Sequence, residues 1–274
     1  MSKILIQTTI TGAQDAWCAQ RFTKLADVLR RDGHTVTARN REPQPDGSDA
    51  VLSHLAESDF DELWLIAADR GNGLSPADVR GILHFRERGG GILTARDRED
   101  LGASLLNLGT IGAVNNFASY NRFRERRRFT RERIAASYAT GMHREPEHRA
   151  FRRIVPLEPV HDVLRSGKSP SGVIEYFPAP PHEGSLSVPA GLKHARVIAL
   201  GANTATGHAQ NLAVAIEGEI GGNGRPSGRA VAASSFHYFA DPDWDRRDGA
   251  PQAIEESFND YIRNLARWLA PIPA

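Results

Sequence analysis

The sequence feature that most constrains the fold is an alternation of short apolar segments with amphipathic segments over the first hundred residues. Apolar or β-branched runs lie at 3–8, 34–38, 60–68 and 91–95, and segments with helical periodicity separate them. Such alternation is typical of parallel strands joined by helices. The pattern therefore predicts an α/β fold with a doubly wound, mainly parallel sheet and helices on both of its faces.

The boundaries of these segments carry local signals. Ser75 followed by Pro76 is a strong helix start, a capping side chain with proline at the first helical position. Three glycines at 89–91 end that helix and lead into the strand at 91–95, after which Asp97 begins an acidic turn. Right-handed crossovers place all carboxyl ends of parallel strands on one rim, where ligands bind. We therefore expect Asp69 and Asp97 to lie close together there.

The whole chain has an ordinary composition, with 274 residues and a formal net charge of +1. The near-zero charge argues against a general nucleic-acid binder. No apolar stretch reaches the length of about 18 residues that a membrane span needs. The first residues enter a strand without the apolar region of a signal peptide, and a single cysteine, Cys18, fits a reducing compartment. We expect one domain over 1–274 and a cytoplasmic location.

The alternation stops between about 110 and 153. Residues 121–153 hold eleven arginines and four glutamates, a local charge of +7. One interpretation is a basic flap over an anionic ligand, or a nucleic-acid face. The other is a solvated helix with its own ion pairs, or a contact between subunits of a homo-oligomer. We favour the second, because few aromatic residues accompany the arginines.

Short apolar runs return in the second half, at 173–177, 196–200, 212–216 and 230–234. A proline-rich loop after the first of them carries His182 and Glu183. His237 follows the last run, and an amphipathic helix over about 251–269 closes the chain.

Three segments together resemble the ThuA-like proteins of the class I glutamine amidotransferase-like superfamily. They are the helix running into RERGGGILTARD, the run VHDVLRSG…IEYF, and GRAVAASSFHYF followed by the helix NDYIRNLARWLA. The resemblance covers most of the chain except about 110–153. It implies a flavodoxin-like fold with a site at the sharp elbow that follows the strand at 91–95.

True amidotransferases place a nucleophilic cysteine at this elbow, supported by a histidine and a glutamate. The elbow here reads Ala95-Arg96-Asp97 and has no thiol, and Cys18 lies on the apolar face of the first helix. The resemblance therefore excludes a thiol glutaminase. ThuA-like relatives also lack that cysteine, and they have a loose link to sugar metabolism.

The candidate site consists of polar residues that the rim should gather. Asp97 and His237 are the candidate acid/base pair, because a histidine beside a carboxylate can move protons near neutral pH. A divalent metal such as zinc, manganese or iron is a candidate cofactor, although no compact ligand motif is present. Its candidate ligands are His182, Glu183 and His237. The residues expected to contact a ligand are Asp69, Arg70, Arg98, Glu99, His182 and Glu183.

Each candidate also has a structural interpretation. Asp97 and Glu99 could cap a helix that starts near Asp100. His237 could be a rim histidine bonded to backbone, and His182 with Glu183 could order their loop. Ser235 is a poor candidate nucleophile, since no glycine-rich elbow surrounds it.

Two functions remain open at this point. The first is binding of a small polar, sugar-derived molecule with acid/base or metal-assisted chemistry of a hydrolase, lyase or isomerase type. The alternative is a non-catalytic binding or assembly protein, a cysteine-less amidotransferase relative.

Overall fold

The structure is a computed structural model that describes residues 1–12, 17–97, 100–117, 119–120, 151–180, 183–202, 209–221, 224–244 and 251–272. Its centre is an eight-stranded sheet with the strand order β2-β1-β3-β4-β12-β11-β10-β7. These strands are β1 (Lys3–Thr8), β2 (Thr35–Arg39), β3 (Glu62–Ile66), β4 (Gly91–Ala95), β7 (Val155–Pro156), β10 (Ala195–Ala202), β11 (Ala209–Ile216) and β12 (Ala230–Ala233).

The parallel part of the sheet is the part that the sequence alternation predicts. β1 pairs in parallel with β2 and β3, and β4 pairs in parallel with β3 and β12. The last three strands extend the sheet in antiparallel pairs. Two small sheets lie outside it, one of β5 (Ser119–Tyr120) with β9 (Gly184–Ser185) and one of β6 (Phe151–Arg153) with β8 (Tyr176–Pro178). The predicted mainly parallel α/β sheet is confirmed.

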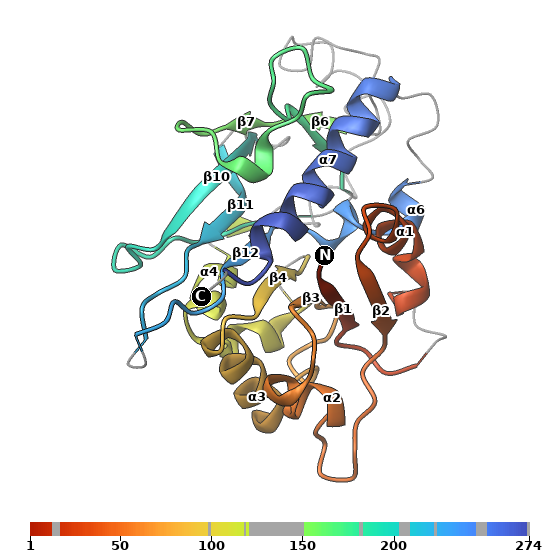
Figure 1. The fold of residues 1–274 in the computed structure, drawn as a ribbon, viewed down its shortest axis with the longest axis vertical. Coiled ribbons are helices and arrows are strands. Elements are labelled where there is room, and N and C mark those ends of the chain that lie inside the picture. The colour runs from red at the N-terminus through yellow and green to blue at the C-terminus, as the bar shows by residue number, and fades with distance from the viewer. Residues whose placement is uncertain are drawn as a thin grey trace.

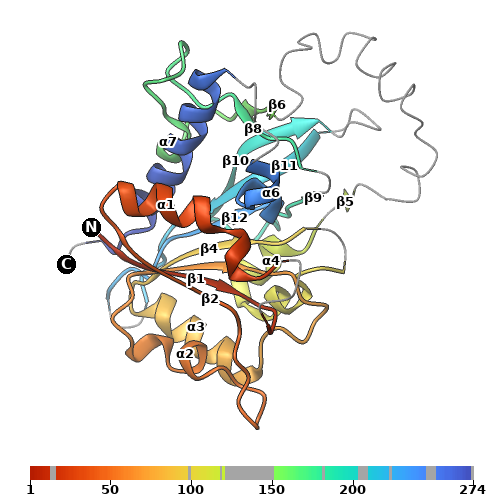
Figure 2. The same cartoon turned by 90° about the vertical axis from the view of Figure 1, so that its right-hand side faces the viewer.

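Helices cover both faces of the sheet, as Figure 2 shows from the side. One face packs against α1 and α7, and alternate strand residues such as Ile4, Trp64 and Leu93 point into that core. The other face packs against α2, α3 and α4, with Leu5, Leu63 and Ile92 in that core. The main helices are α1 (Thr23–Arg31), α2 (Ala50–Ser53), α3 (Pro76–Glu87), α4 (Gly109–Asn115), α6 (Asp241–Trp244) and α7 (Gln252–Leu269).

The sequence signals around α3 act as expected. Ser75 Oγ accepts from the Asp78 N–H at 3.1 Å, and the Asp78 carboxylate accepts from the Ser75 N–H at 2.8 Å, which forms a capping box. The chain then turns at Gly89, whose φ of 103° suits glycine. Gly91 opens β4, and the backbone of Leu269 at the end of α7 packs directly against it.

Two helix starts differ from the sequence-based expectation. The sequence between the runs at 3–8 and 34–38 predicts a helix from about Asp15, and Asp15 lies outside the described residues. A 3₁₀ turn (Ala19–Arg21) comes first and α1 begins at Thr23. Asp241 caps α1 from far along the chain by accepting from the Thr23 and Lys24 N–H groups at 3.0 Å each. Local sequence could not predict this cap, because its acceptor is 218 residues away from Thr23.

The helix expected near Asp100 begins instead as a 3₁₀ helix at Ala103–Asn107, followed by α4. Most of the arginine-rich segment, 121–150, lies outside the described residues, so the predictions about it stay predictions. Within the ranges described above, no helix is both long and apolar enough to cross a membrane.

Candidate functional site

The candidate site lies at the carboxyl ends of β4 and β12, which are neighbours in the sheet. Their parallel register pairs Ala95 with Ala233, so the residues that follow leave the sheet at the same level. Asp97 comes two residues after β4. His237 lies in a 3₁₀ turn (Phe236–Tyr238) that Ser235 caps by accepting from the His237 N–H at 3.3 Å.

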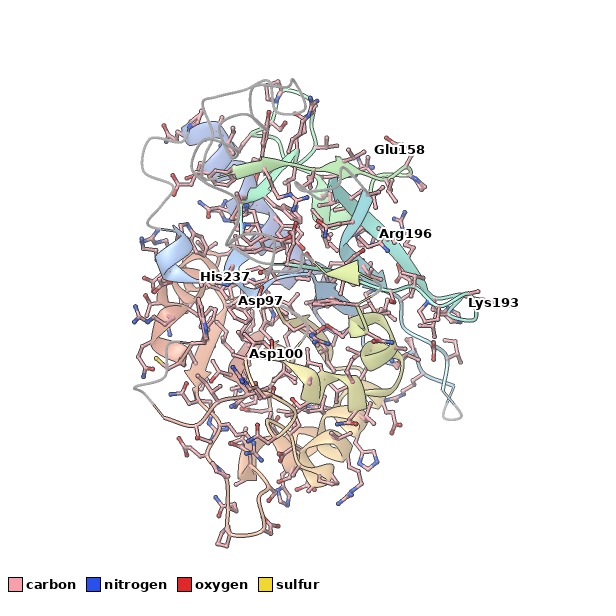
Figure 3. The ribbon with its side chains drawn as sticks, turned by 180° about the vertical axis from the view of Figure 1, so that it is seen from behind. Asp97, Asp100, Glu158, Lys193, Arg196 and His237 are labelled. Atoms are coloured by element: carbon pink, nitrogen blue, oxygen red, sulfur yellow. The ribbon has the colours of Figure 1, made fainter. Side chains whose placement is uncertain are left out.

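Asp97 and His237 face one another across this edge (Figure 3). Asp97 Oδ2 lies 3.7 Å from His237 Nε2, and the two side chains are 1% and 4% exposed. Ser235 Oγ donates to the other carboxylate oxygen, Asp97 Oδ1, at 3.4 Å. The 3.7 Å between Asp97 Oδ2 and His237 Nε2 is longer than a hydrogen bond, but it suits an ion pair when the imidazole is protonated. In active sites without bound substrate, catalytic groups often lie at such long distances and move closer when the substrate binds.

Aromatic rings fix the orientation of the imidazole. Phe236 stacks on His237 with ring centroids 4.8 Å apart, and Trp17 meets the ring edge-on at 4.7 Å. These rings remove water from around the pair, which strengthens any electrostatic interaction there. Aromatic rings therefore enclose the imidazole of His237 on two sides.

A second polar group adjoins His237 through the next residue in the chain. The Tyr238 hydroxyl donates to Glu183 Oε2 at 2.8 Å and lies 2.9 Å from Ser234 Oγ. Arg152 forms an ion pair with the other Glu183 oxygen. Burial raises the pKa of Tyr238 to about 12, so its hydroxyl keeps its proton at neutral pH, and burial lowers the pKa of Arg152.

Glu183 was expected to contact a ligand or a metal, and both of its oxygens are engaged within the protein. His182 lies outside the described residues. The described part of the chain contains no group of three or more His, Cys, Asp or Glu side chains that could hold a metal ion. The proposed metal ligation by His182, Glu183 and His237 therefore stays a prediction.

Asp69 and Arg70 also lie at the rim, but the structure gives them other partners. The Asp69 carboxylate accepts from the Gly71 N–H at 2.7 Å, from the Ser104 N–H at 3.2 Å and from Ser104 Oγ at 2.7 Å. Asp69 thus orders the loop that begins the 3₁₀ helix at 103–107. Arg70 is exposed and lies 3.8 Å from Asp100.

Arg98 and Glu99 lie outside the described residues, so their expected ligand contacts are untested. Arg96, which carried no expected role, is buried. Its Nε and Nη1 donate to the Leu101 and Asn115 carbonyls at 3.0 Å each, and its guanidinium lies over the Phe117 ring. Arg96 therefore holds the shape of the elbow.

Sequence reasoning missed three residues near the site, namely Arg152, Gln210 and Tyr238. Arg152 is one arginine among many in its segment, and Gln210 is a lone polar residue in an apolar strand. The tyrosine follows His237 directly, which was the one available signal. The three residues come from β6, β11 and the 3₁₀ turn at 236–238, which are far apart in the sequence.

Comparisons with known proteins locate the fold. No family model and no curated protein matches the sequence. A solved ThuA-like protein from Parabacteroides merdae matches over 98% of this chain and 89% of its own, with a TM-score of 0.51 and 12% identity.

Two other solved structures are weaker matches. The exo-β-1,4-mannosidase Op5Man5 from Opitutaceae bacterium strain TAV5 matches over 99% of this chain and 37% of its own (TM-score 0.47, 11% identity). A GMP synthase protein from Thermoplasma acidophilum matches over 98% and 96% (TM-score 0.42, 10% identity). The chain therefore has the fold of a ThuA-like protein, an α/β fold of the flavodoxin-like kind.

Proposed function

We propose that the chain binds a small polar molecule at the carboxyl-end rim of β4 and β12, and that Asp97 and His237 exchange protons with it. The observation that carries the proposal is the 3.7 Å approach of Asp97 Oδ2 to His237 Nε2. Two titratable groups from neighbouring strand ends meet where ligands of open α/β sheets bind. A sugar-derived ligand is the candidate, because the ThuA-like resemblance points to sugar metabolism.

The roles of the two groups follow from their partners. Asp97 has one oxygen fixed by Ser235, so its other oxygen is available to the imidazole or to a ligand hydroxyl. The carboxylate would accept a hydrogen bond and stabilise positive charge on His237. His237 would take or give the proton, since histidine titrates near neutral pH. Such a pair suits a hydrolase, lyase or isomerase step.

A non-catalytic binding protein is the second candidate, and the burial of the pair favours it. Side chains that are only 1% and 4% exposed can stabilise the fold as well as take part in a reaction. In that case Asp97 and His237 would contribute to binding or stability, and no compound would be converted.

The test uses protein with ¹³C/¹⁵N-labelled histidine and the probes D-glucose, D-sorbitol, D-gluconate and inorganic phosphate. We expect at least one probe to shift the His237 imidazole signals. Asp97→Asn should weaken its binding by about tenfold or more, the loss of one charged hydrogen bond. Asp59→Asn, at an exposed carboxylate outside the site, is the control.

Turnover separates the two candidates. Conversion of the bound probe, followed by NMR of the small molecule and lost in Asp97→Asn, supports the enzyme. Binding without conversion supports the binding protein. Unchanged His237 signals with all four probes would contradict both.

A further inference from the structure

Gln210 on β11 is a buried amide without a hydrogen-bond partner. Its side chain is 1% exposed, and neither Oε1 nor Nε2 has a partner in the described part of the chain. Burying an amide in this way destabilises a protein, because water no longer satisfies its donor and acceptor. A native structure that keeps such a group calls for a reason.

The register of β10 and β11 shows where this amide lies. Gln210 is paired directly with Gly201, and directly opposed residues in antiparallel strands carry their side chains on the same face. A Cβ on Gly201 would clash with the Arg152 guanidinium and the Leu212 side chain. Leu212 belongs to the core under α1 and α7. Gln210 therefore stands on that face, beside the guanidinium of Arg152.

The same register brings Gln210 to the rim that carries the candidate site. The Ser234 N–H donates to the Leu212 carbonyl at 2.9 Å, so β11 passes this edge level with the residues that precede His237. Neighbouring strands are about 4.8 Å apart, which puts β11 about 10 Å from β4. The strand spacing therefore allows one small ligand to reach both Asp97 and Gln210.

The surroundings of Gln210 determine what it can recognise. Arg152 and Glu183 neutralise one another, so no net charge faces the amide from this pair. A neutral amide offers one acceptor and one donor side by side, which matches a hydroxyl group that both donates and accepts.

We propose that Gln210 contacts the ligand of the candidate site and binds an uncharged, hydroxyl-bearing part of it. This inference rests on the proposed function. It adds the chemical class of the ligand, which is a neutral polyol. The amide then has no hydrogen-bond partner until the ligand binds, and this destabilises the ligand-free protein.

Gln210→Met tests this, because methionine has nearly the same length and volume and lacks the amide. If Gln210 binds a ligand and has no hydrogen-bond partner without it, its replacement should affect stability and ligand binding in opposite directions. The variant should unfold at a higher temperature than the wild type in the absence of ligand. It should also bind D-sorbitol or D-glucose about tenfold more weakly.

The matched control is Tyr261→Phe on α7. The Tyr261 hydroxyl is likewise buried without a partner among the described residues, and its ring packs on Phe177 at a centroid distance of 4.7 Å. Its removal should raise the unfolding temperature and leave polyol binding unchanged. The control therefore separates loss of a ligand contact from a general change in core packing.

The outcomes are separable from those of the proposed function. If Gln210→Met lowers stability, an ordered water or a protein group satisfies the amide and the inference is wrong. It is also wrong if polyol binding is unchanged in the variant, or if both polyols bind the wild type more weakly than about 100 mM. Binding of D-gluconate or phosphate alone, sensed by His237 and lost in Asp97→Asn, would leave the proposed function standing and overturn this assignment.

Discussion

At the scale of single residues, two buried titratable side chains outside the candidate site link protonation to folding. Glu62 is the first residue of β3 and is fully buried. Its carboxylate accepts a hydrogen bond from Trp64 Nε1 at 2.9 Å. Burial raises its pKa to about 8. His161 is buried against the Trp268 ring, and burial, with the charge of Arg196, lowers its pKa to about 4. Burial of Glu62 makes the fold less stable as the pH rises, and burial of His161 makes it less stable as the pH falls.

Glu62→Gln should remove a loss of stability at alkaline pH. Between pH 4.5 and about 8 the unfolded chain releases the Glu62 proton while the folded chain keeps it, so wild-type stability falls as pH rises. The slope approaches about 1.4 kcal/mol per pH unit at most. Urea unfolding at pH 5 and pH 8 should show the variant gaining on the wild type at pH 8. Equal pH dependence in both proteins would show that Glu62 is ionised in the folded state.

His161→Asn should remove a loss of stability at acid pH. As the pH falls from 6.5 to about 4, the unfolded chain takes up a proton that the folded chain does not, so wild-type stability falls. Asparagine can still accept from the Val163 N–H, as His161 Nδ1 does at 3.3 Å. Thermal unfolding between pH 7 and 4.5 should show a shallower decline in the variant. His84→Asn, at an exposed histidine of α3, should decline like the wild type.

At the scale of elements, the triple-glycine turn joins α3, β4 and α7 through close backbone packing. Gly89 has a φ of 103° and open space around its Cα. A Cβ on Gly91 would meet the Leu269 carbonyl. Only a residue without a side chain lets the end of α7 approach β4 this closely.

Gly89→Ala and Gly91→Ala should therefore differ in cost. Gly89→Ala should lower the free energy of unfolding by about 1 kcal/mol, the strain of a left-handed backbone. Gly91→Ala should cost about 3 kcal/mol, because the backbone of α7 has to move. Chemical unfolding of the two variants gives the comparison. Equal losses would mean that α7 adjusts freely to β4.

At the scale of the whole molecule, the Arg152–Glu183 pair connects segments that are far apart in sequence. Arg152 comes from β6, Glu183 from the residue before β9, and Tyr238 from the turn after β12. Gly201 on β10 leaves room for the guanidinium. The pair thus fixes the arrangement of four segments around the rim.

The Arg152 and Glu183 side chains should be energetically coupled in the folded protein. Glu183→Gln or Arg152→Met alone leaves a buried charge and should cost about 3–5 kcal/mol of unfolding free energy. The double variant should lose less than the sum, with a coupling of about 2 kcal/mol or more in a double-mutant cycle. Arg70 and Asp100, 74% and 51% exposed, form the control pair, with a coupling below about 1 kcal/mol. A coupling at Arg152–Glu183 as small as at this pair would show that water screens it.

Local sequence signals were enough to predict the parallel half of the sheet. Strand positions at 3–8 and 91–95, the Ser75 cap and the place of Asp97 on the rim follow from signals within a few residues and from the rule that parallel strand ends share one edge. The position of His237 next to Asp97 was implied by the ThuA-like resemblance. The absence of a thiol at the elbow was also visible directly. These features depend on periodicity and on short contacts along the chain.

The other features depend on how distant segments pack in the folded protein. The cap of α1 by Asp241, the pairing of Arg152 with Glu183 and the unsatisfied amide of Gln210 each join segments distant in sequence. No local pattern marks such partners, because their energies arise from burial, and burial depends on which elements pack together. The antiparallel strands β7, β10 and β11 belong here too, since their order is set by long-range pairing. For this reason the approach of Asp97 to His237 was predictable, and the partners of the polar groups around them were not.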